Sequence, residues 1–277
     1  MNLTVQQILY DAEKLLSEKV DSARLDAEII LEYVTKKERT FFHIHPETKL
    51  SLKEISEFKS LIKRRINFEP VAYITGIKEF YGLKFKVNKN VFIPRPETEL
   101  ILDELFSTIP NDFNGRILDL GTGCGCLAIV IKKRLKKAKV YASDISKDAL
   151  KVAKENLVLL KTGNINFILS DKFEKISGKF EIIVCNPPYI PESAKIEPSV
   201  KNYEPHTALF GGKDGLSFIH PFLEEVPQHL KKNGILLMEC GIETSGLIPK
   251  ILPVSLKINK IIKDLSGKDR IVVIKKV

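Results

Sequence analysis

The sequence of 277 residues contains no apolar run that approaches the roughly 20 residues a membrane-spanning helix needs. Its first residues, Met1 to Thr4, lack the basic start and apolar core of a secretory signal peptide. The chain also has no internal repeat and no low-complexity segment. We therefore expect a globular protein of the cytoplasm that does not associate with membranes, and its 44% hydrophobic content is sufficient for packed cores.

Cysteine is scarce, and the four cysteines show no Cys-x-x-Cys spacing. His43 and His45 are two residues apart with no third ligand nearby, so we expect no metal site. A cytoplasmic setting disfavours disulfides. We interpret the cysteines as small core residues; they are Cys124, Cys126, Cys185 and Cys240.

Charge is unbalanced, with a formal net charge of +9. Such an excess favours encounters with an acidic or RNA-rich partner but does not by itself establish nucleic-acid binding. The densest basic run, Lys132 to Lys137, falls at the end of a predicted helix, where cations complement the helix dipole. A solvated helix face is a simpler interpretation of this run than a track for phosphates.

The length indicates two domains, and the first of them is predicted to be helical. Thr4 to Gln7 and Ser51 to Glu54 both fit a capping box followed by apolar residues at helical spacing. Further helices are expected over residues 22–34 and 37–42. We predict a small helical bundle over residues 1–75, whose outer face is a candidate surface for docking a protein substrate.

The pattern then changes to that of a β-hairpin linker over residues 76–96. We expect one strand over Phe80 to Val87, a turn at Asn88-Lys89-Asn90 and a returning strand over Val91 to Ile93. Arg95 to Glu99 follows and opens a helix, because proline and acidic residues are typical of a first turn.

Residues 97–277 alternate strand-like and helical segments, which predicts a parallel sheet covered by helices on both faces. The tail is expected to close the sheet as an antiparallel hairpin. The predicted strands lie near residues 116–120, 139–143, 165–169, 181–185, 235–240, 256–263 and 270–275.

A glycine loop follows the first of these strands. Arg116 to Leu120 leads into Gly121-Thr122-Gly123-Cys124-Gly125, and a helix is expected over Cys126 to Leu135. Glycines let the backbone turn tightly and approach a ligand, and a helix N-terminus adds oriented N–H groups. The G-x-G-x-G spacing differs from the dinucleotide fingerprint, and the Gly-Lys-Ser/Thr ending of a phosphate loop is missing.

Asp144 ends the second predicted strand, 23 residues after Gly121. An acid about 20 residues beyond such a loop can bind both hydroxyls of a ribose. The alternative is that Asp144 caps the next helix, although Ser146 is at least as good a cap. Asp119, just before the glycines, either meets a cationic group of the ligand or caps the loop.

The strand over Glu181 to Cys185 delivers Asn186-Pro187-Pro188-Tyr189. The Asn186 side-chain oxygen and the Pro187 carbonyl can accept the two N–H bonds of a planar NH2 group. The prolines fix φ, and Tyr189 offers a flat face for stacking. The simpler alternative is a loop in which prolines end the strand.

Taken together, a ribose site and a grip for an NH2 group at neighbouring strand ends favour methyl transfer from a nucleoside cofactor to nitrogen. The chain resembles S-adenosylmethionine-dependent methyltransferases with a seven-stranded Rossmann-like sheet, in the branch carrying (Asn/Asp)-Pro-Pro-(Tyr/Phe/Trp). It is similar more specifically to the HemK/PrmC family, and this resemblance covers nearly the whole chain. The motifs that carry it are Glu69 to Gly76, Glu79 to Gly82, Ile93 to Glu99, Tyr203 to Pro205 and Ala208 to Gly215.

The resemblance implies an enzyme that uses S-adenosyl-L-methionine to methylate the glutamine of the Gly-Gly-Gln loop in class I peptide-chain release factors. It implies catalytic roles for Asn186, Pro187 and Tyr189, with Pro188 completing the substrate grip. Glu97 and Thr98 are secondary candidates, because their segment lines the cofactor pocket in the family. The implied cofactor-binding residues are Gly121, Thr122, Gly123, Cys124, Gly125, Asp144 and Asn186, with Lys172 and Phe173 standing where relatives often have an aromatic adenine contact.

Three other readings remain open. The same grip fits the amino group of adenine or cytosine, although the helical domain has no zinc cluster or aromatic RNA-binding signature, so we expect no direct nucleic-acid substrate. A ribosomal-protein glutamine methyltransferase is related, but its Pro-Arg segment lacks the Pro-Glu-Thr-Glu continuation. A binding module without activity would not need both turns intact. In the leading hypothesis the methyl group passes directly from the cofactor to the substrate nitrogen, because no activated nucleophile accompanies the Asn186-Pro187-Pro188-Tyr189 turn.

Overall fold

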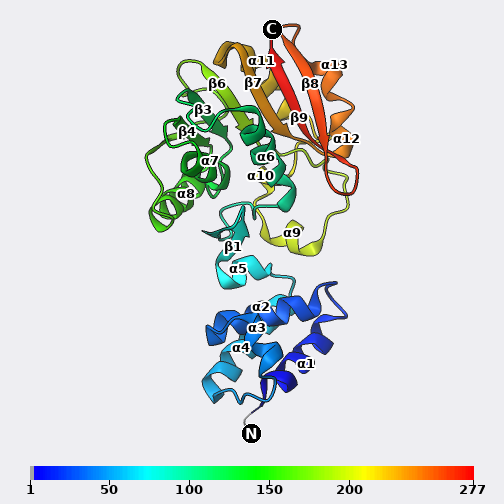
Figure 1. Ribbon diagram of the computed structural model, residues 1–277. Helices are drawn as coiled ribbons and strands as arrows, with labels where there is room; N and C mark the ends of the chain where they lie inside the picture. The colour runs from blue at the N-terminus through cyan, green and yellow to red at the C-terminus, as the bar shows by residue number, and fades with distance from the viewer. Residues whose placement is uncertain (1–2) are drawn as a thin grey trace. The chain divides into compact units, whose positions relative to one another are not determined.

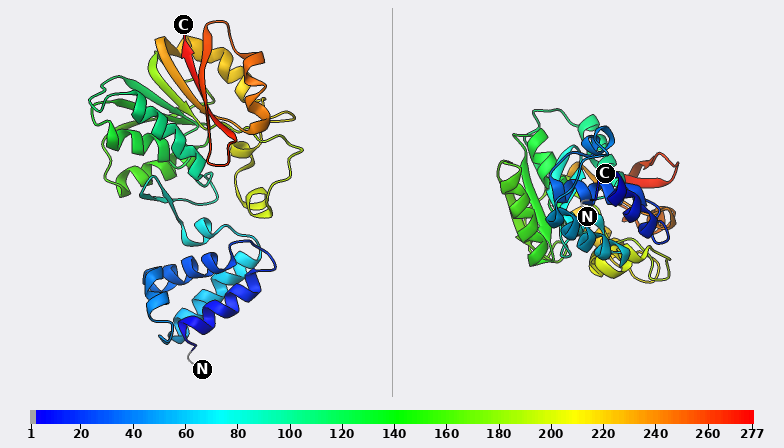
Figure 2. Two further views of the ribbon diagram at one scale, coloured as in Figure 1. Left: turned by 45° about the vertical axis from the view of Figure 1, so that its right-hand side comes forward. Right: turned by 90° about the horizontal axis from the view of Figure 1, so that it is seen from below.

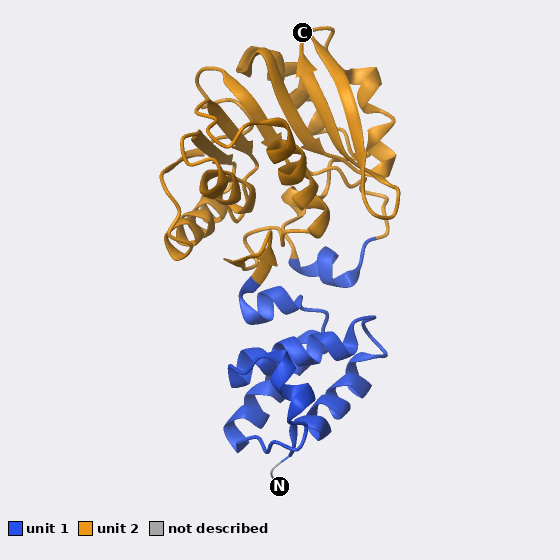
Figure 3. Cartoon of the chain, in the orientation of Figure 1, with its two compact units in different colours: residues 1–77, 196–203 blue, residues 78–195, 204–277 orange. Residues whose placement is uncertain are grey.

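The computed structural model describes residues 3–277 and divides into two compact units (Figures 1 and 3). One unit comprises residues 1–77 and 196–203, and the other comprises residues 78–195 and 204–277. Met1 and Asn2, which begin the predicted helical domain, lie outside the described residues. Within residues 3–277, no helix combines the length and apolar character that crossing a bilayer requires.

The first unit is a helical bundle. Both predicted capping boxes are confirmed, because Thr4 and Ser51 each accept a bond from the backbone of the third helical residue, at 3.3 Å. Arg65 and Asp26 form a buried ion pair in this unit, with Arg65 Nε 2.7 Å from Asp26 Oδ2. Its helices are α1 (Val5–Leu16), α2 (Ala23–Thr35), α3 (Arg39–Ile44), α4 (Leu52–Ile66) and α5 (Val71–Thr75), joined by α9 (Pro198–Tyr203).

Helix α9 reaches this unit from far along the chain. The Tyr203 hydroxyl donates to the Asn67 carbonyl oxygen at 2.8 Å. Sequence reasoning placed no part of residues 196–203 with the bundle, because this contact joins residues 136 positions apart.

The β-hairpin lies earlier than expected. Strands β1 (Ile77–Phe80) and β2 (Leu83–Lys86) meet through Tyr81 and Gly82, both at positive φ (50° and 70°). Glycine adopts this conformation freely, and the Tyr81 N–H donates to Glu99 Oε1 at 2.7 Å. The prediction of a single strand over Phe80 to Val87 was therefore wrong, and residues 91–93 form no strand.

The second unit contains a seven-stranded sheet in the order β5-β4-β3-β6-β7-β9-β8, with β9 antiparallel to both of its neighbours. The prediction of a seven-stranded Rossmann-like sheet is confirmed. Apolar runs bury both faces of the central strands. The strands are β3 (Arg116–Leu120), β4 (Lys139–Asp144), β5 (Ile165–Leu169), β6 (Phe180–Cys185), β7 (Leu230–Glu239), β8 (Leu256–Lys263) and β9 (Asp269–Lys276).

Helices cover both faces of this sheet (Figure 2). Helices α6, α7 and α8 pack in sequence on one face, and α11 packs with the core on the other. The helices of this unit are α6 (Glu99–Thr108), α7 (Cys126–Arg134), α8 (Lys147–Leu159), α10 (His206–Leu209), α11 (Ile219–His229), α12 (Ile242–Ser245) and α13 (Ile248–Ile251), with a 3-10 turn, η1 (Pro96–Thr98).

Strand register brings four loops to one edge. Leu120 pairs with both Ser143 and Cys185, and Cys185 pairs with Met238. The residues that follow these positions therefore meet at the carboxyl edge of the sheet, where open α/β folds bind ligands.

Candidate active site

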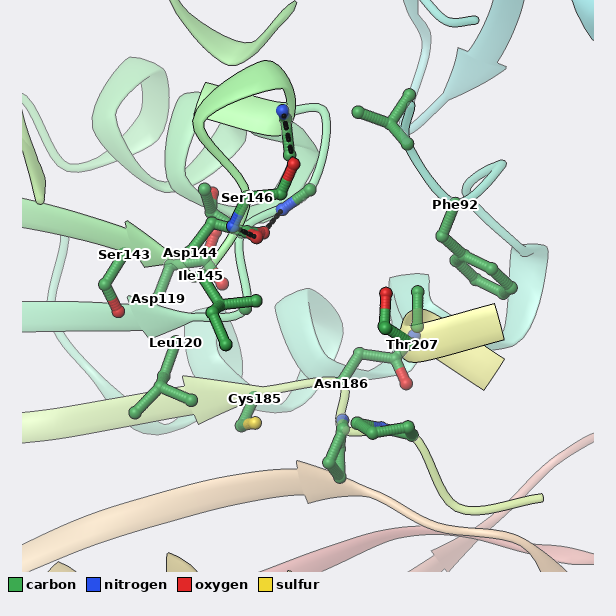
Figure 4. A pocket seen from close by; sticks show the side chains of 18 of the residues that line it. Phe92, Asp119, Leu120, Ser143, Asp144, Ile145, Ser146, Cys185, Asn186 and Thr207 are labelled. Atoms are coloured by element: carbon green, nitrogen blue, oxygen red, sulfur yellow. Dashed lines mark hydrogen bonds between the residues drawn. The ribbon is translucent and has the colours of Figure 1, made fainter. Parts of the chain in front are cut away.

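A cavity of about 270 Å³ opens at this edge of the second unit. Of the sequence-predicted site residues, it is lined by Thr98, Gly121 to Cys124, Asp144, Lys172 and Asn186 to Pro188. Gly125, Phe173 and Tyr189 are not among its lining residues. Figure 4 shows Asp144 and Ser146 on one side of the pocket and Phe92 and Thr207 on the other, with Asn186 between the two sides at its base.

The glycine loop is open toward the pocket. Gly121 and Gly123 have positive φ (75° and 55°), and a Cβ at either would meet no protein atom within 4 Å. The Gly121 and Thr122 N–H groups both donate to the Ser143 carbonyl oxygen at 2.9 Å. Gly125 instead supports packing, because a Cβ there would lie 3.1 Å from that of Ala153. The loop thus leaves room for a ligand against its backbone.

Asp144 braces this loop. Its Oδ2 accepts from Gly123 N at 2.9 Å and its Oδ1 from Ser146 N at 2.8 Å, as the dashed lines in Figure 4 mark. Burial raises the pKa of Asp144, while the N–H groups of Ser146 and Gly123 lower it. The N-cap of α8 is Ser146, whose Oγ accepts from Ala149 N at 3.1 Å. Helix capping therefore does not account for Asp144.

Asp119 lies at the floor of the pocket and is only 1% exposed. Its Oδ2 accepts from the Thr122 hydroxyl at 2.6 Å and from Ala128 N at 3.1 Å. Its Oδ1 is buried without a hydrogen-bond partner. Burial raises the pKa of Asp119 to about 7. An unsatisfied carboxylate oxygen in a cavity favours a ligand that brings a cation or an N–H donor.

Asn186 is held by side chains from other segments. Its Nδ2 donates to Thr98 Oγ1 at 3.2 Å, and the Thr98 hydroxyl donates to Glu239 Oε2 at 2.7 Å. The Tyr189 hydroxyl donates to the other oxygen, Glu239 Oε1, at 3.0 Å. Thr98 lines the pocket, whereas Tyr189 is turned to Glu239. The expected stacking face of Tyr189 is thus not presented to the cavity.

Glu239 was not predicted from the sequence. It ends β7, is 1% exposed, and accepts two hydroxyl donors. Burial raises the pKa of Glu239, while the bonds from Thr98 and Tyr189 and the charge of Arg270 lower it. The available signal was an acid at the carboxyl end of an apolar strand, the same signal that identified Asp144.

Phe173 does not reach the cavity. Its ring is 3% exposed and stacks on Phe222, with centroids 5.5 Å apart, and on His229, with centroids 4.2 Å apart. A large apolar ring gains more from this core than from a partly wet pocket. The aromatic rings that do line the cavity are Phe92 and Phe218, and neither was singled out from the sequence. Lys172, predicted as a cofactor contact, lines the cavity, with its Nζ 3.0 Å from Asp171 Oδ1.

Glu204 ties together two motif segments beside the pocket. It is 4% exposed, accepts from Ile93 N at 3.1 Å, and forms an ion pair with Arg95. The Arg95 guanidinium in turn lies 4.7 Å from the ring centroid of Phe92. Phe92 lines the cavity, as do Pro205 and Thr207 just after Glu204. The Pro-Arg segment and the Tyr-Glu-Pro segment therefore build one wall.

Covalent catalysis by a thiol is disfavoured here. Cys124, Cys126 and Cys185 line the cavity, but all three are buried. A bond with Cys124 and burial raise the pKa of the Cys126 thiol, and burial raises that of Cys185. Protonated thiols are poor nucleophiles. Across residues 3–277, no group of three or more His, Cys, Asp or Glu could hold a metal ion.

Comparison with known proteins gives a consistent pattern. The PrmC N-terminal domain matches residues 7–76, and the methyltransferase small domain matches residues 86–202. The release factor glutamine methyltransferase of Koribacter versatilis is 37% identical over 276 residues, covering 98% of each chain. The bifunctional methyltransferase of Rickettsia typhi is 39% identical over 296 residues; the match covers 98% of this chain but only 57% of that protein's length.

The fold has counterparts among solved structures. A methyltransferase from Pyrococcus furiosus aligns with a TM-score of 0.53 at 20% identity, covering 72% of this chain and 91% of that one. At this identity the likeness concerns the fold alone.

Proposed function

Because this chain belongs to the HemK/PrmC family of release factor glutamine methyltransferases, we propose that it methylates the side-chain amide nitrogen of a glutamine with S-adenosylmethionine as donor. The substrate is the Gly-Gly-Gln loop of class I peptide-chain release factors. One observation carries the proposal beyond the family: the bond from Asn186 Nδ2 to Thr98 leaves the Asn186 side-chain oxygen as an acceptor at the pocket. A carboxamide NH2 group supplies the matching donor.

The pocket suits the cofactor on three counts. Asp144 can accept from ribose hydroxyls with the remaining lone pairs of its carboxylate. The orphaned Oδ1 of Asp119 suits an ammonium group. Phe92 and Phe218 supply ring faces for a planar base. The open backbone at Gly121 and Gly123 provides the space between these groups.

The chain's own contribution to the reaction is alignment. An amide nitrogen is a poor nucleophile because its lone pair is delocalised, so holding it in line with the methyl group matters most. Asn186 Oδ1 and the Pro187 carbonyl accept its two N–H bonds and stabilise the positive charge that develops on nitrogen. When bound, S-adenosylmethionine would supply an electrophilic methyl group, whose bond to sulfur would break as its bond to the amide nitrogen formed; the nitrogen would then lose a proton to solvent.

The decisive assay offers labelled S-adenosylmethionine to the protein with four acceptors in parallel. These are a purified class I release factor, the same factor with its loop glutamine changed to alanine, transfer RNA, and DNA. We expect label on the first alone. Label on either polynucleotide and none on the release factor would replace the proposal with nucleic-acid amino methylation. Label on the alanine variant would move the target away from the Gly-Gly-Gln loop.

We also propose that the helical domain predicted at residues 1–75 helps to dock the release factor. Several large apolar side chains of its unit face solvent, and the most exposed are Tyr10, Ile44 and Leu52, at 63%, 69% and 68%. Changing them to serine should raise KM for the release factor and leave methylation of a short Gly-Gly-Gln peptide unchanged. Equal losses with both substrates would indicate a folding defect and not a docking role.

A further inference from the structure

The hydrogen bonds behind Asn186 have a fixed direction. A carboxylate has no proton to donate, so Glu239 can only accept. Thr98 must then give its hydroxyl proton to Glu239, at 2.7 Å, and can offer only a lone pair on its other side. Asn186 meets that lone pair at 3.2 Å with its NH2 group. The carboxylate thus determines which end of the Asn186 amide points away from Thr98.

We propose that Glu239 is a positioning residue that acts through Thr98 to present the oxygen of Asn186, and never its NH2 group, to the substrate. This inference rests on the proposed function and deepens it. An amide whose two ends are similar in size would otherwise rotate between donor and acceptor. With the relay in place, the pocket accepts N–H bonds from a carboxamide and repels the oxygens of a carboxylate of the same shape.

The chemistry at position 239 favours this role over mere cross-linking. Burying a carboxylate to 1% exposure is costly unless its acceptors are used, and here both oxygens are used, by Thr98 and Tyr189. A neutral glutamine could also join these hydroxyls. It would not fix their direction, because its amide can turn either its oxygen or its NH2 group toward Thr98. Only the charged form makes both hydroxyls donors.

The first test uses Thr98→Val, which keeps the shape and removes the relay, beside Thr98→Ser, which keeps the hydroxyl. We expect kcat for release factor methylation to fall roughly 10- to 100-fold in the valine variant, the loss typical of one hydrogen bond to a charged network. The serine variant should recover most of that loss. Thr108→Val is the matched control, since the Thr108 hydroxyl also donates to a buried carboxylate, Glu104, at 2.9 Å, and neither residue lines the pocket.

The second test measures discrimination, which a purely structural role would not change. A release factor carrying glutamate in place of the loop glutamine serves as a competitive inhibitor. In the wild type its inhibition constant should greatly exceed the KM of the glutamine form. In Thr98→Val and in Glu239→Gln that ratio should shrink by roughly tenfold, because the Asn186 amide can then turn its NH2 group outward. In Thr108→Val the ratio should match the wild type.

A double-mutant cycle closes the test. If both residues act through one relay, Thr98→Val combined with Glu239→Gln should lose little more than the worse single variant. Additive losses, or an unchanged discrimination ratio in a variant that still binds S-adenosylmethionine by calorimetry, would overturn the proposal. If Glu239→Gln does not fold, the comparison of Thr98→Val with Thr98→Ser decides the test. A wild type that methylates no release factor would instead defeat the proposed function, before any variant is compared.

Discussion

The two sides of the pocket are built in opposite ways. On the proposed cofactor side, the backbone comes from one continuous segment, β3 to the start of α8, and its shape relies on glycine φ angles and backbone N–H groups. The amide side joins η1, the loop after β6 and the end of β7, through hydrogen bonds that span 88 and 141 positions. The cofactor side therefore depends on local backbone geometry. The amide side depends on a chain of side-chain hydrogen bonds that exists only once the whole unit has folded.

This difference has an energetic consequence. Backbone groups survive most substitutions, so the cofactor side should lose function gradually as its side chains are changed. The amide side depends on a few donors and acceptors, and removing one leaves the next unsatisfied in a buried place. We therefore expect the largest single losses on the amide side.

The largest effect is expected for Asn186→Ala. Removing the acceptor should lower turnover by roughly 10³-fold, the upper range for losing one group that stabilises developing charge. Binding of S-adenosylmethionine, measured by calorimetry, should be retained because the glycine loop is untouched. Turnover equal to the wild type would show that the amide side does not act on the reacting nitrogen.

The same contrast explains what the sequence could predict. The strand ends of the proposed cofactor side were predictable, because Gly121 to Gly125 and Asp144 follow apolar strands that lie close together along the chain. The strands of the sheet were predictable because short apolar runs alternate with segments whose apolar residues recur at helical spacing. Glu239 was missed because nothing local links it to Asn186, and its partner Thr98 lies 141 positions away.

Aromatic residues were the least predictable part of the site. Phe173 has the right position along the chain for a cofactor contact, but its ring turns into the core against Phe222. The hairpin turn was misplaced for a similar reason. Asn88-Lys89-Asn90 carries the stronger turn composition, but Glu99, 18 positions away from Tyr81, stabilises the earlier turn.

The next effect in size concerns Asp144→Ala, on the cofactor side. Loss of the carboxylate should raise the Kd for S-adenosylmethionine roughly 10- to 100-fold, as expected for hydrogen bonds to a charged group. Ser146→Ala is the comparison variant, because it removes the cap of α8 and should cost about 1 kcal/mol of stability with a smaller change in Kd. Equal changes in Kd for the two variants would show that Asp144 supports the structure and does not contact the ribose.

A pH dependence of about five- to sixfold should follow from Asp119. Burial raises its pKa to about 7, so the cofactor-free protein holds it mostly protonated at pH 6 and mostly ionised at pH 7.5. A cationic ligand binds the ionised form, so affinity rises with pH across this window, roughly eightfold for a single titrating group. An α-amino group on the ligand loses about a third of its protonation by pH 7.5, which reduces the net rise to about five- to sixfold. Calorimetry at both pH values should show this rise in the wild type, and Asp119→Asn should be nearly flat.

The smallest effect separates the two candidate aromatic contacts. Phe218 lines the pocket, so Phe218→Leu should raise the Kd for S-adenosylmethionine roughly threefold through the loss of ring stacking. Phe173 packs in the core, so Phe173→Leu should leave the Kd near the wild-type value and lower the free energy of unfolding by about 1–2 kcal/mol. Urea unfolding and calorimetry on the same two variants measure both quantities. If Phe173→Leu weakened binding while Phe218→Leu did not, the adenine contact would lie at Phe173, the position that the sequence indicated. The side chains of the cofactor side, like its backbone, would then come from residues close together along the chain.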